Sequence, residues 1–462
     1  MGTNYKKSVL YPIIPENAFS FKNVVYIDKR FTMPKSLLIT QCNIIRDPFF
    51  FKKDHFVRIE DGFITAIGPM AQPHEITADH VIDGTNKLVI PGLINGHCHS
   101  PMTLFRGMAD DLDLTTWLRN HIFPAEAAHI NEESVYWCSR LAAAEMLLSG
   151  TTCVADAYFY SDQTAQAFAE SGIRAVVGHA VLDIAAPGIS EPNRQLDVVG
   201  EYLHRWKHRS PLITPAIFAH SPYTCSPTTL QNAKKLADDN NVRFFIHLAE
   251  GFDEHRQIIS PVADTPLRHL HTLGILDDNC VLIHAIWLDD HDLDILSESK
   301  AQVILCPQSN YKLASGRSRA ADMAALGIPL GLGTDGPASN NSLNMFREMD
   351  LLAKSYKAHH LDPTIFPAAQ VFAMATDTVN TIIGMSSSNS LRIGSRADLA
   401  LIDLCSPHLT PFYNENLLVY GVGGADVDTV IVDGKIVVEK GRIVTIDLRK
   451  TMDMVAQFAK TL

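Results

Sequence analysis

Short apolar runs alternate with segments of helix length through the middle of the chain. From Lys87 onward, eight runs of nearly continuous apolar residues each end in polar residues. A strand that is covered on both faces, as in a parallel barrel, has this composition. The runs are LVIPGLINGHCH (88–99), TTCVADAY (151–158), IRAVVGHAVLD (173–183), LITPAIFAHS (212–221), VRFFIHLAE (242–250), CVLIHAIW (280–287), QVILCPQSN (302–310) and IPLGLGTDG (328–336). Eight strands with helices between them predict an α/β protein built on a TIM-type (β/α)8 barrel.

Both ends of the chain carry a different pattern, made of short β-rich pieces. Residues 34–90 and 386–462 contain such pieces, broken by the hairpin signals Asp61-Gly62 and Asp433-Gly434. Neither half alone would bury a face, so we expect one small β-sandwich assembled from both ends of the chain. The barrel then occupies residues 91–385.

Three further segments lie between or beyond the predicted strands. Residues 1–33 hold scattered prolines and little periodicity, so we expect an irregular N-terminal arm. The segment 133–150 predicts a helix that Gly150 closes, and the segment 363–384 predicts one further helix after the last barrel strand.

Composition and charge narrow the function classes. Apolar residues make up 46% and charged residues 19% of the chain, which is typical of a folded globular protein, and no run reaches the roughly 18 apolar residues of a membrane span. The net charge is −12 with both signs scattered, so we expect no binding to nucleic acid or to membranes. The eight cysteines form no CxxC pair and no targeting signal is visible, which predicts a cytoplasmic protein with reduced thiols.

Side chains that can bind a metal stand at the ends of four predicted strands. His97 and His99 are two positions apart at the end of the first strand, so they point to the same side. The ends of the fifth, sixth and eighth strands carry His247, His284 and Asp335. An isolated HxH pair would more often be structural. Because the carboxyl ends of all barrel strands meet at one mouth, however, these five groups predict a metal site there.

The expected ion is zinc, one per chain. Three imidazoles with one carboxylate suit zinc and leave a position for a water molecule, whose pKa the ion lowers. Iron and manganese remain alternatives, since imidazole also suits iron. A second metal in this architecture is typically bridged by a modified lysine near the fourth strand, and LITPAIFAHSPYTC (212–225) contains none.

Other polar side chains near these strand ends are candidates for substrate contacts. Glu250 follows His247 by three residues and can reach a substrate above the metal as a general acid, because a partly dry pocket raises the pKa of a carboxyl group. A solvated loop carboxylate is the alternative. His220 and Tyr223 end the fourth strand either as substrate contacts or, for His220, as a buried structural side chain.

Five motifs occur in order between about residues 36 and 448. They are PGLINGHCHSPMTLFRGMADDLDLTTWL (91–118), HSPYTCSP (220–227), HLAE (247–250), CPQSNYKLASG (306–316) and GTDGPASNNSLNMFREM (333–349). Together they resemble the amidohydrolase superfamily. Within it the chain is most similar to the 5′-methylthioadenosine/S-adenosylhomocysteine deaminases, in the branch that also holds s-triazine chlorohydrolases.

The resemblance implies a role for each metal-site residue. His97, His99, His247 and Asp335 would hold the zinc. His284 would lie outside the ligand set, where it would hydrogen-bond the metal's water and help to move protons.

The resemblance also implies a set of substrate contacts. Glu250 would contact the ring nitrogen beside the attacked carbon, Glu126 in FPAEA would bind the ribose hydroxyls, and His220 would complete the contacts. Arg194 matches a family arginine through a loosely aligned loop. Phe105 and Trp117 are expected to stack on or enclose the base. Ordinary core packing is the alternative for the aromatics.

The resulting hypothesis is hydrolytic deamination of adenine nucleosides, with release of ammonia. The first alternative is an enzyme that acts on another ring, such as guanine, a pterin, cytosine or a chlorinated triazine. Glu126 favours a nucleoside over these rings, because only a nucleoside offers ribose hydroxyls. A non-catalytic scaffold of the same fold is the second, although scaffolds lose metal ligands that this chain retains. The family also implies a homo-oligomer, either a dimer or a tetramer, acting on a small molecule.

Overall fold

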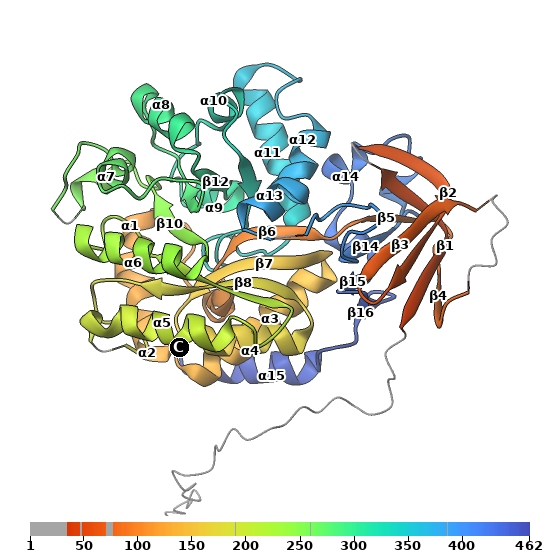
Figure 1. Ribbon diagram of the computed structural model, residues 1–462, viewed down its shortest axis with the longest axis horizontal. Helices are drawn as coiled ribbons and strands as arrows, with labels where there is room; N and C mark the ends of the chain where they lie inside the picture. The colour runs from red at the N-terminus through yellow and green to blue at the C-terminus, as the bar shows by residue number, and fades with distance from the viewer. Residues whose placement is uncertain (1–34, 47–48, 71–76, 190, 259, 386) are drawn as a thin grey trace, which may run out of the picture. The chain divides into compact units, whose positions relative to one another are not determined.

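The computed structural model describes residues 35–46, 49–70, 77–189, 191–258, 260–385 and 387–462, so the predicted arm at 1–33 lies outside the described residues. Eight parallel strands follow one another in sheet order from β6 to β13 (Figure 1). They are β6 (Leu93–Cys98), β7 (Thr151–Tyr158), β8 (Arg174–Val181), β9 (Ile213–Ala219), β10 (Phe244–Leu248), β11 (Cys280–His284), β12 (Gln302–Leu305) and β13 (Leu330–Leu332). Each lies within one of the eight predicted runs, which confirms the TIM-type barrel.

The first and last strands meet where the barrel closes. The N–H of Asp335, three residues past β13, donates to the carbonyl of His97 in β6 at 3.0 Å. Gly333 lies so close to β6 that an added Cβ would stand 2.6 Å from the backbone nitrogen of His97. The absence of a side chain at residue 333 therefore lets the ends of the two strands approach.

Helices connect the strands in the predicted alternation. They are α3 (Glu132–Leu148), α4 (Ser161–Ser171), α5 (Gln195–Trp206), α6 (Pro227–Asn240), α7 (Pro266–Thr272), α8 (Asp290–Ser299), α9 (Pro307–Lys312), α10 (Ala320–Ala325) and, after the last strand, α11 (Met345–His360). The α3 prediction is confirmed: Asn131 accepts the N–H groups of Glu133 and Ser134 at 3.0 Å each, and Gly150 turns left-handed with φ +84° just past the end.

Short helical turns fill the connection between β6 and α3. They are η1 (Ser100–Phe105), α1 (Leu114–Trp117), the π-helical η2 (Leu118–Ile122) and α2 (Phe123–His129). Side chains from these turns line the cavity described below.

One predicted helix was wrong in its continuity. Residues 363–384 form two short helices, α12 (Ala368–Met374) and α13 (Asp377–Ile382), instead of one. The backbone at Thr376, with φ −135° and ψ −99°, leaves the helical region and separates them.

A second sheet of nine strands joins both ends of the chain. Its order is β17-β16-β15-β14-β5-β1-β2-β3, with β4 paired to β1. The strands are β1 (Ser36–Arg46), β2 (Phe50–Glu60), β3 (Phe63–Pro69), β4 (His80–Asp83), β5 (Lys87–Pro91), β14 (Leu399–Asp403), β15 (Val427–Val432), β16 (Lys435–Glu439) and β17 (Arg442–Ile443). Leu37 and Val57 from one end share a buried cluster with Leu401 and Ile431 from the other, which confirms one β unit built from both ends.

The first predicted barrel run divides between the two sheets. Residues 88–99 were expected to form one strand, but β5 pairs with β14 in the second sheet and β6 begins the barrel. The chain passes between them at Gly92, where an added Cβ would stand 2.1 Å from the Thr152 hydroxyl oxygen. A strand with apolar residues throughout gives no signal of this change of sheet.

The alternation of side chains along β14 explains how the second sheet is anchored. Leu399 and Leu401 face the sheet's own core, whereas Ala400 and Ile402 join the large core that includes the barrel. The buried Arg174 of β8 adds an ion pair to Asp398 at 2.6 Å. The sheet is therefore fixed to the barrel by both apolar packing and a buried charge pair.

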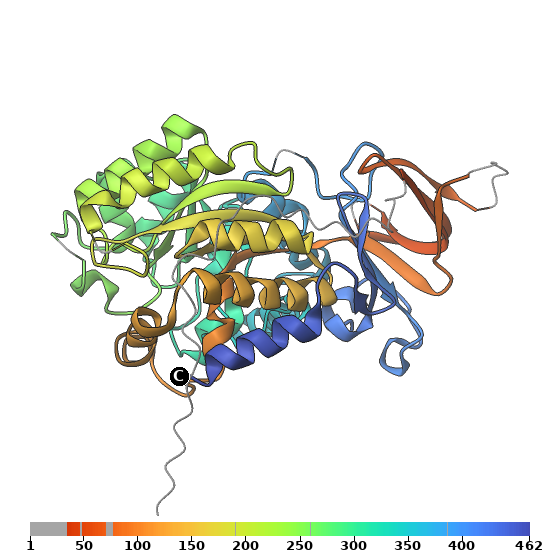
Figure 2. The ribbon, with the colours of Figure 1, turned by 90° about the horizontal axis from the view of Figure 1, so that it is seen from below.

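The C-terminal helix α15 (Leu448–Ala459) returns from the second sheet to the barrel. It packs along α3 and is drawn in dark blue in Figure 2. Within the described ranges, no helix is both long enough and apolar enough to cross a membrane. All eight cysteines are unpaired, and seven of them are buried while Cys405 is exposed.

Candidate active site

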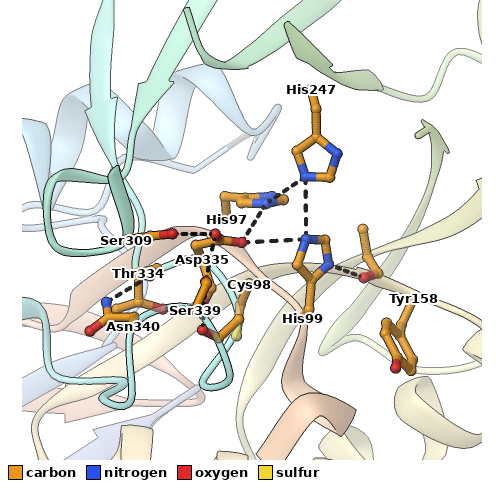
Figure 3. Close-up of polar contacts among 12 residues, drawn as sticks. His97, Cys98, His99, Tyr158, His247, Ser309, Thr334, Asp335, Ser339 and Asn340 are labelled. Carbon is orange, nitrogen blue, oxygen red and sulfur yellow. Dashed lines mark hydrogen bonds and ion pairs between the residues drawn. The ribbon is translucent and has the colours of Figure 1, made fainter. Parts of the chain in front are cut away.

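Four side chains from the ends of three barrel strands converge on one point (Figure 3). The Nε2 atom of His247 lies 3.2 Å from the Nε2 atoms of both His97 and His99. The Oδ1 atom of Asp335 lies 3.4 Å from the same two nitrogens of His97 and His99. Strand alternation in β6 presents the first two imidazoles together, as the sequence predicted.

This donor set fits a tetrahedral metal ion. Donor atoms about 2.0–2.2 Å from one ion at tetrahedral angles lie about 3.3–3.6 Å apart, close to the separations observed here. The second ring nitrogens are already engaged, because Nδ1 of His99 lies 2.6 Å from the Ala157 carbonyl and Nδ1 of His247 lies 2.8 Å from the His220 carbonyl. Each Nδ1 therefore carries the proton, and each Nε2 turns a lone pair toward the shared centre.

Burial keeps the imidazoles in the form that binds metal. It lowers the pKa of His97 to about 3 and lowers the pKa of His247 well below its ordinary value. Both rings are consequently neutral near pH 7, and a metal ion does not need to displace protons from them.

Asp335 is held by hydroxyl groups on the side away from the imidazoles. Its Oδ2 accepts hydrogen bonds from the hydroxyls of Ser309 and Ser339, each at 2.7 Å. Oδ1 is thereby left facing His97 and His99. The two serines fix which carboxylate oxygen points to the centre.

His284 lies beside this group, at the end of β11. One of its ring nitrogens lies within 4.8 Å of donor atoms of His97, His247 and Asp335. Its Nδ1 lies 2.8 Å from the amide oxygen of Asn310, so Nδ1 carries the proton and Nε2 is left as an acceptor. His99 is in direct contact with His247 and Asp335, at 3.2 and 3.4 Å, so five metal-competent side chains surround the same centre.

The turns that present these side chains use left-handed backbone at residues other than glycine. The angle φ is +50° at Ala249, +72° at His284 and +62° at Asp335. Such conformations cost about 1–3 kcal/mol each and persist where surrounding contacts fix them. The ends of three strands thus carry strain where the candidate site is built.

Glu250 enters the site from the turn that follows β10. It is buried, and its Oε2 lies 3.6 Å from Nε2 of His284. Burial, with a smaller contribution from the charge of Asp335, raises its pKa well above the ordinary value. A carboxyl in this environment can hold a proton near neutral pH and pass it to a bound molecule.

A cavity of about 910 Å³, including space open to solvent, lies over these groups. Its lining contains His99, His247, His284, Glu250 and Asp335, together with Trp117, Glu126, Tyr158, His220, Tyr223 and a set of mainly apolar residues. A mostly apolar wall with a few convergent polar groups is typical of a small-molecule site.

Glu126 and His220 stand on the cavity wall as predicted. Glu126 is buried and accepts the Tyr158 hydroxyl at 2.6 Å, while burial raises the pKa of Glu126 to about 7. Nδ1 of His220 lies 3.0 Å from the Thr224 hydroxyl, and burial lowers the pKa of His220 to about 3. His220 is therefore both structurally satisfied and part of the wall.

Two predicted substrate contacts lie away from the cavity. Phe105 is 1% exposed within η1, packs in an apolar cluster with Met102 and Leu104, and does not belong to the cavity lining. Arg194, at the end of η3 (Pro192–Arg194), is exposed and does not belong to the cavity lining. Trp117 does line the cavity.

Sequence reasoning missed three residues that act around the site, namely Tyr158, Ser339 and Glu254. Tyr158 ends the second barrel strand, where a polar side chain was a usable signal. Glu254 accepts the backbone N–H of Glu250 at 2.8 Å, and only its spacing in HLAEGFDE hinted at this contact.

Comparison with known proteins places the chain among deaminases. Residues 88–437 match the amidohydrolase family. A 5-methylthioadenosine/S-adenosylhomocysteine deaminase from Syntrophus aciditrophicus is 40% identical over 413 residues, which cover 87% of this chain and 93% of the relative. A 5′-deoxyadenosine deaminase from Methanothermobacter thermautotrophicus is 40% identical over 401 residues, which cover 86% and 92%.

A solved structure extends the similarity to the fold. An adenosine deaminase from Xanthomonas campestris with bound zinc matches with a TM-score of 0.89 and 32% sequence identity, covering 92% of this chain and 99% of that one. The likeness includes both the barrel and the second sheet, because so little of either chain is left out.

Proposed function

The chain belongs to the amidohydrolase family, and from this premise we propose that it is a zinc-dependent deaminase of adenine nucleosides. The proposed substrates are 5′-methylthioadenosine and S-adenosylhomocysteine, with adenosine as a further candidate, in line with the names of the relatives. The reaction replaces the ring amino group by oxygen. A C–N bond is broken, a C–O bond forms from water, and ammonia leaves.

The proposed zinc ligands are His97, His99, His247 and Asp335, one ion per chain. Their spacing and their neutral imidazoles support this assignment. Zinc held by these four side chains would lower the pKa of a bound water molecule and so would supply the nucleophile.

Glu250 is the proposed proton donor to the substrate. Its raised pKa allows the carboxyl to hold a proton, which it gives to the ring nitrogen beside the carbon under attack. His284 faces Glu250 with an unprotonated Nε2, which orients the attacking water by accepting a hydrogen bond. The proton that His284 receives is then available for the departing amine.

The observation that carries the nucleoside assignment is the position of Glu126. A buried carboxyl with one oxygen occupied by Tyr158 leaves the other oxygen to accept from a ribose hydroxyl inside the cavity. A free nucleobase offers no such hydroxyls. Trp117 and His220 complete the proposed pocket on the same wall.

The test is an ammonia-release assay on metal-replete protein, with chloride release followed for the triazine and bound metal quantified on the same sample. The substrates are 5′-methylthioadenosine, S-adenosylhomocysteine, adenosine, guanine, cytosine, a pterin and a chlorinated triazine. We expect turnover of the adenine nucleosides with about one zinc per chain. Turnover of only a nucleobase, a pterin or the triazine, or protein that binds no metal and turns over nothing, would contradict the proposal.

We further propose a cytoplasmic homo-oligomer, a dimer or a tetramer. The unpaired cysteines support a reducing compartment, and the family resemblance supports the assembly. Light scattering coupled to size-exclusion chromatography tests the assembly, and a monomer at micromolar concentration would contradict it.

A further inference from the structure

The peptide group between Ala249 and Glu250 determines where the Glu250 side chain points. Ala249 has φ +50°, a left-handed conformation that a residue with a Cβ adopts at a cost. This turn redirects the chain from β10, which carries His247, so that Glu250 enters the cavity three residues later. Contacts from the surrounding residues must therefore compensate for the cost of this conformation.

Hydrogen bonds hold this peptide group from both sides. Its carbonyl, on Ala249, accepts the N–H groups of Ile286 and Trp287 at 3.1 and 3.0 Å. Its N–H, on Glu250, donates to Oε2 of Glu254 at 2.8 Å. The first contact comes from the chain just past His284, so the turn is tied to the end of β11.

Among the described residues, Glu254 is the only one whose side chain forms a hydrogen bond with this peptide group. It is 2% exposed and begins the short helix η4 (Glu254–Arg256), where its own N–H donates to the Gly251 carbonyl at 3.1 Å. Burial raises the pKa of Glu254 to about 7, while backbone N–H groups of Ala249 and Glu250 oppose that rise. Burying a carboxyl is expensive unless the contacts it makes are needed.

We propose that Glu254 is a positioning residue that holds the left-handed turn at Ala249 and thereby aims Glu250 at the substrate. The inference rests on the proposed function in that Glu250 is taken as the proton donor. Glu254 acts as a hydrogen-bond acceptor and does not touch the substrate or transfer a proton itself.

The competing possibility is a proton relay from Glu254 to Glu250. The Oε1 atom of Glu254 is buried without a hydrogen-bond partner among the described residues, and Glu254 also lines a second cavity that adjoins the first at Glu250. A glutamine separates the two roles, because its amide oxygen still accepts backbone N–H groups but its side chain cannot carry an acidic proton.

The experiment compares Glu254→Ala, Glu254→Gln and the control Asp253→Asn. Asp253 is the exposed neighbour that pairs with Arg256 on the same turn. We expect Glu254→Ala to lower kcat on the order of 100-fold, as a misplaced catalytic group does, with bound zinc unchanged. Glu254→Gln should recover kcat to within about fivefold of wild type with the same pH profile, since the turn is retained. Loss of activity in Glu254→Gln equal to that in Glu254→Ala would overturn the positioning role in favour of the relay.

A second measurement needs no substrate. Hydrogen exchange of peptides spanning residues 247–256, read by mass spectrometry, reports whether the Glu250 amide stays protected. We expect faster exchange in Glu254→Ala, and protection in Glu254→Gln and Asp253→Asn. Unchanged exchange in Glu254→Ala would overturn the positioning role of Glu254, whatever the substrate is. If the exchange pattern were as expected but the wild-type protein were inactive, only the proposed function would be contradicted.

Discussion

The Nε2 atom of His284 lies 3.6 Å from the Oε2 atom of Glu250, and both side chains are buried. Because Asn310 engages the other ring nitrogen of His284, the face turned to Glu250 is an acceptor. The pair therefore brings together a carboxyl that holds a proton and an imidazole that accepts one, with the cavity beside them. Such a pair can serve the proposed deamination as general acid and general base.

Glu250→Gln tests the proton donor directly. Glutamine keeps the size of the side chain but cannot give a proton to a ring nitrogen, so we expect kcat to fall by about 10²–10⁴-fold. Zinc content should be unchanged, because Glu250 does not belong to the four converging ligands. Steady-state ammonia release with metal analysis measures both, and a variant with near-normal kcat would remove Glu250 from the mechanism.

Ser309→Ala and Ser339→Ala test how Asp335 is oriented. Each change removes one of the two hydroxyl donors to Oδ2, so the carboxylate loses the contact that turns Oδ1 toward the imidazoles. Loss of such an outer contact typically weakens metal affinity by about 10–100-fold. Competition with a zinc chelator measures the affinity. Variants that bind zinc as tightly as wild type would show that the imidazoles alone fix the site.

Glu126 predicts a pH dependence of nucleoside binding. Burial raises its pKa to about 7, so the carboxyl is largely neutral at pH 6 and largely ionised at pH 8, where it accepts ribose hydroxyls best. We expect KM for 5′-methylthioadenosine to fall about tenfold between these pH values. In Glu126→Gln, KM should be higher and independent of this ionisation. An equal pH dependence in the variant would assign the effect to another group.

The same ionisation affects folding stability in the opposite direction. A carboxyl whose pKa is raised on folding stabilises the protein below its ordinary pKa of 4.5, and this contribution is lost as the pH rises through about 7. Glu126→Gln should therefore melt at the wild-type temperature at pH 4 and above it at pH 8. Thermal unfolding at both pH values provides the comparison, and equal melting temperatures at pH 8 would contradict the burial effect.

The convergence of the metal-competent side chains could be predicted, because the order of strands in a parallel barrel determines where the end of each strand lies. His97, His99, His247, His284 and Asp335 each end an apolar run, and the carboxyl ends of the strands share one mouth. The side chains that orient them were harder to foresee. Ser339 lies in a turn and Glu254 begins the short helix η4. Both make their contacts next to left-handed backbone, which no periodic pattern encodes.

The wrong helix prediction and the two predicted contacts that lie outside the cavity lining have related physical causes. Phe105 follows the metal-binding motif closely in sequence, but η1 turns its ring into an apolar cluster. Arg194 was carried over through a loop, and loops do not preserve the position of a side chain as strands do. The break at Thr376 was missed because apolar residues continue across it at helical spacing. Each of these differences falls where local backbone geometry, and not hydrophobic pattern, decides the position of the residue.

Gly333→Ala tests whether barrel closure positions the metal site. The added Cβ would stand 2.6 Å from the backbone nitrogen of His97, so the ends of β6 and β13 must separate, and the hydrogen bond from Asp335 to the His97 carbonyl is stretched. We expect the free energy of unfolding to fall by about 1–3 kcal/mol, as for other overpacked interiors, and zinc affinity to fall with it.

The matched control is Gly200→Ala in α5, where an added Cβ meets no atom within 4 Å. This change replaces a helical glycine by the best helix former, so we expect a gain of about 0.5–1 kcal/mol with unchanged zinc affinity. Denaturant unfolding and chelator competition on both variants provide the comparison. If Gly333→Ala lost stability but bound zinc as tightly as wild type, the approach of β6 to β13 would serve packing alone, and the geometry of His97 and Asp335 would not depend on it.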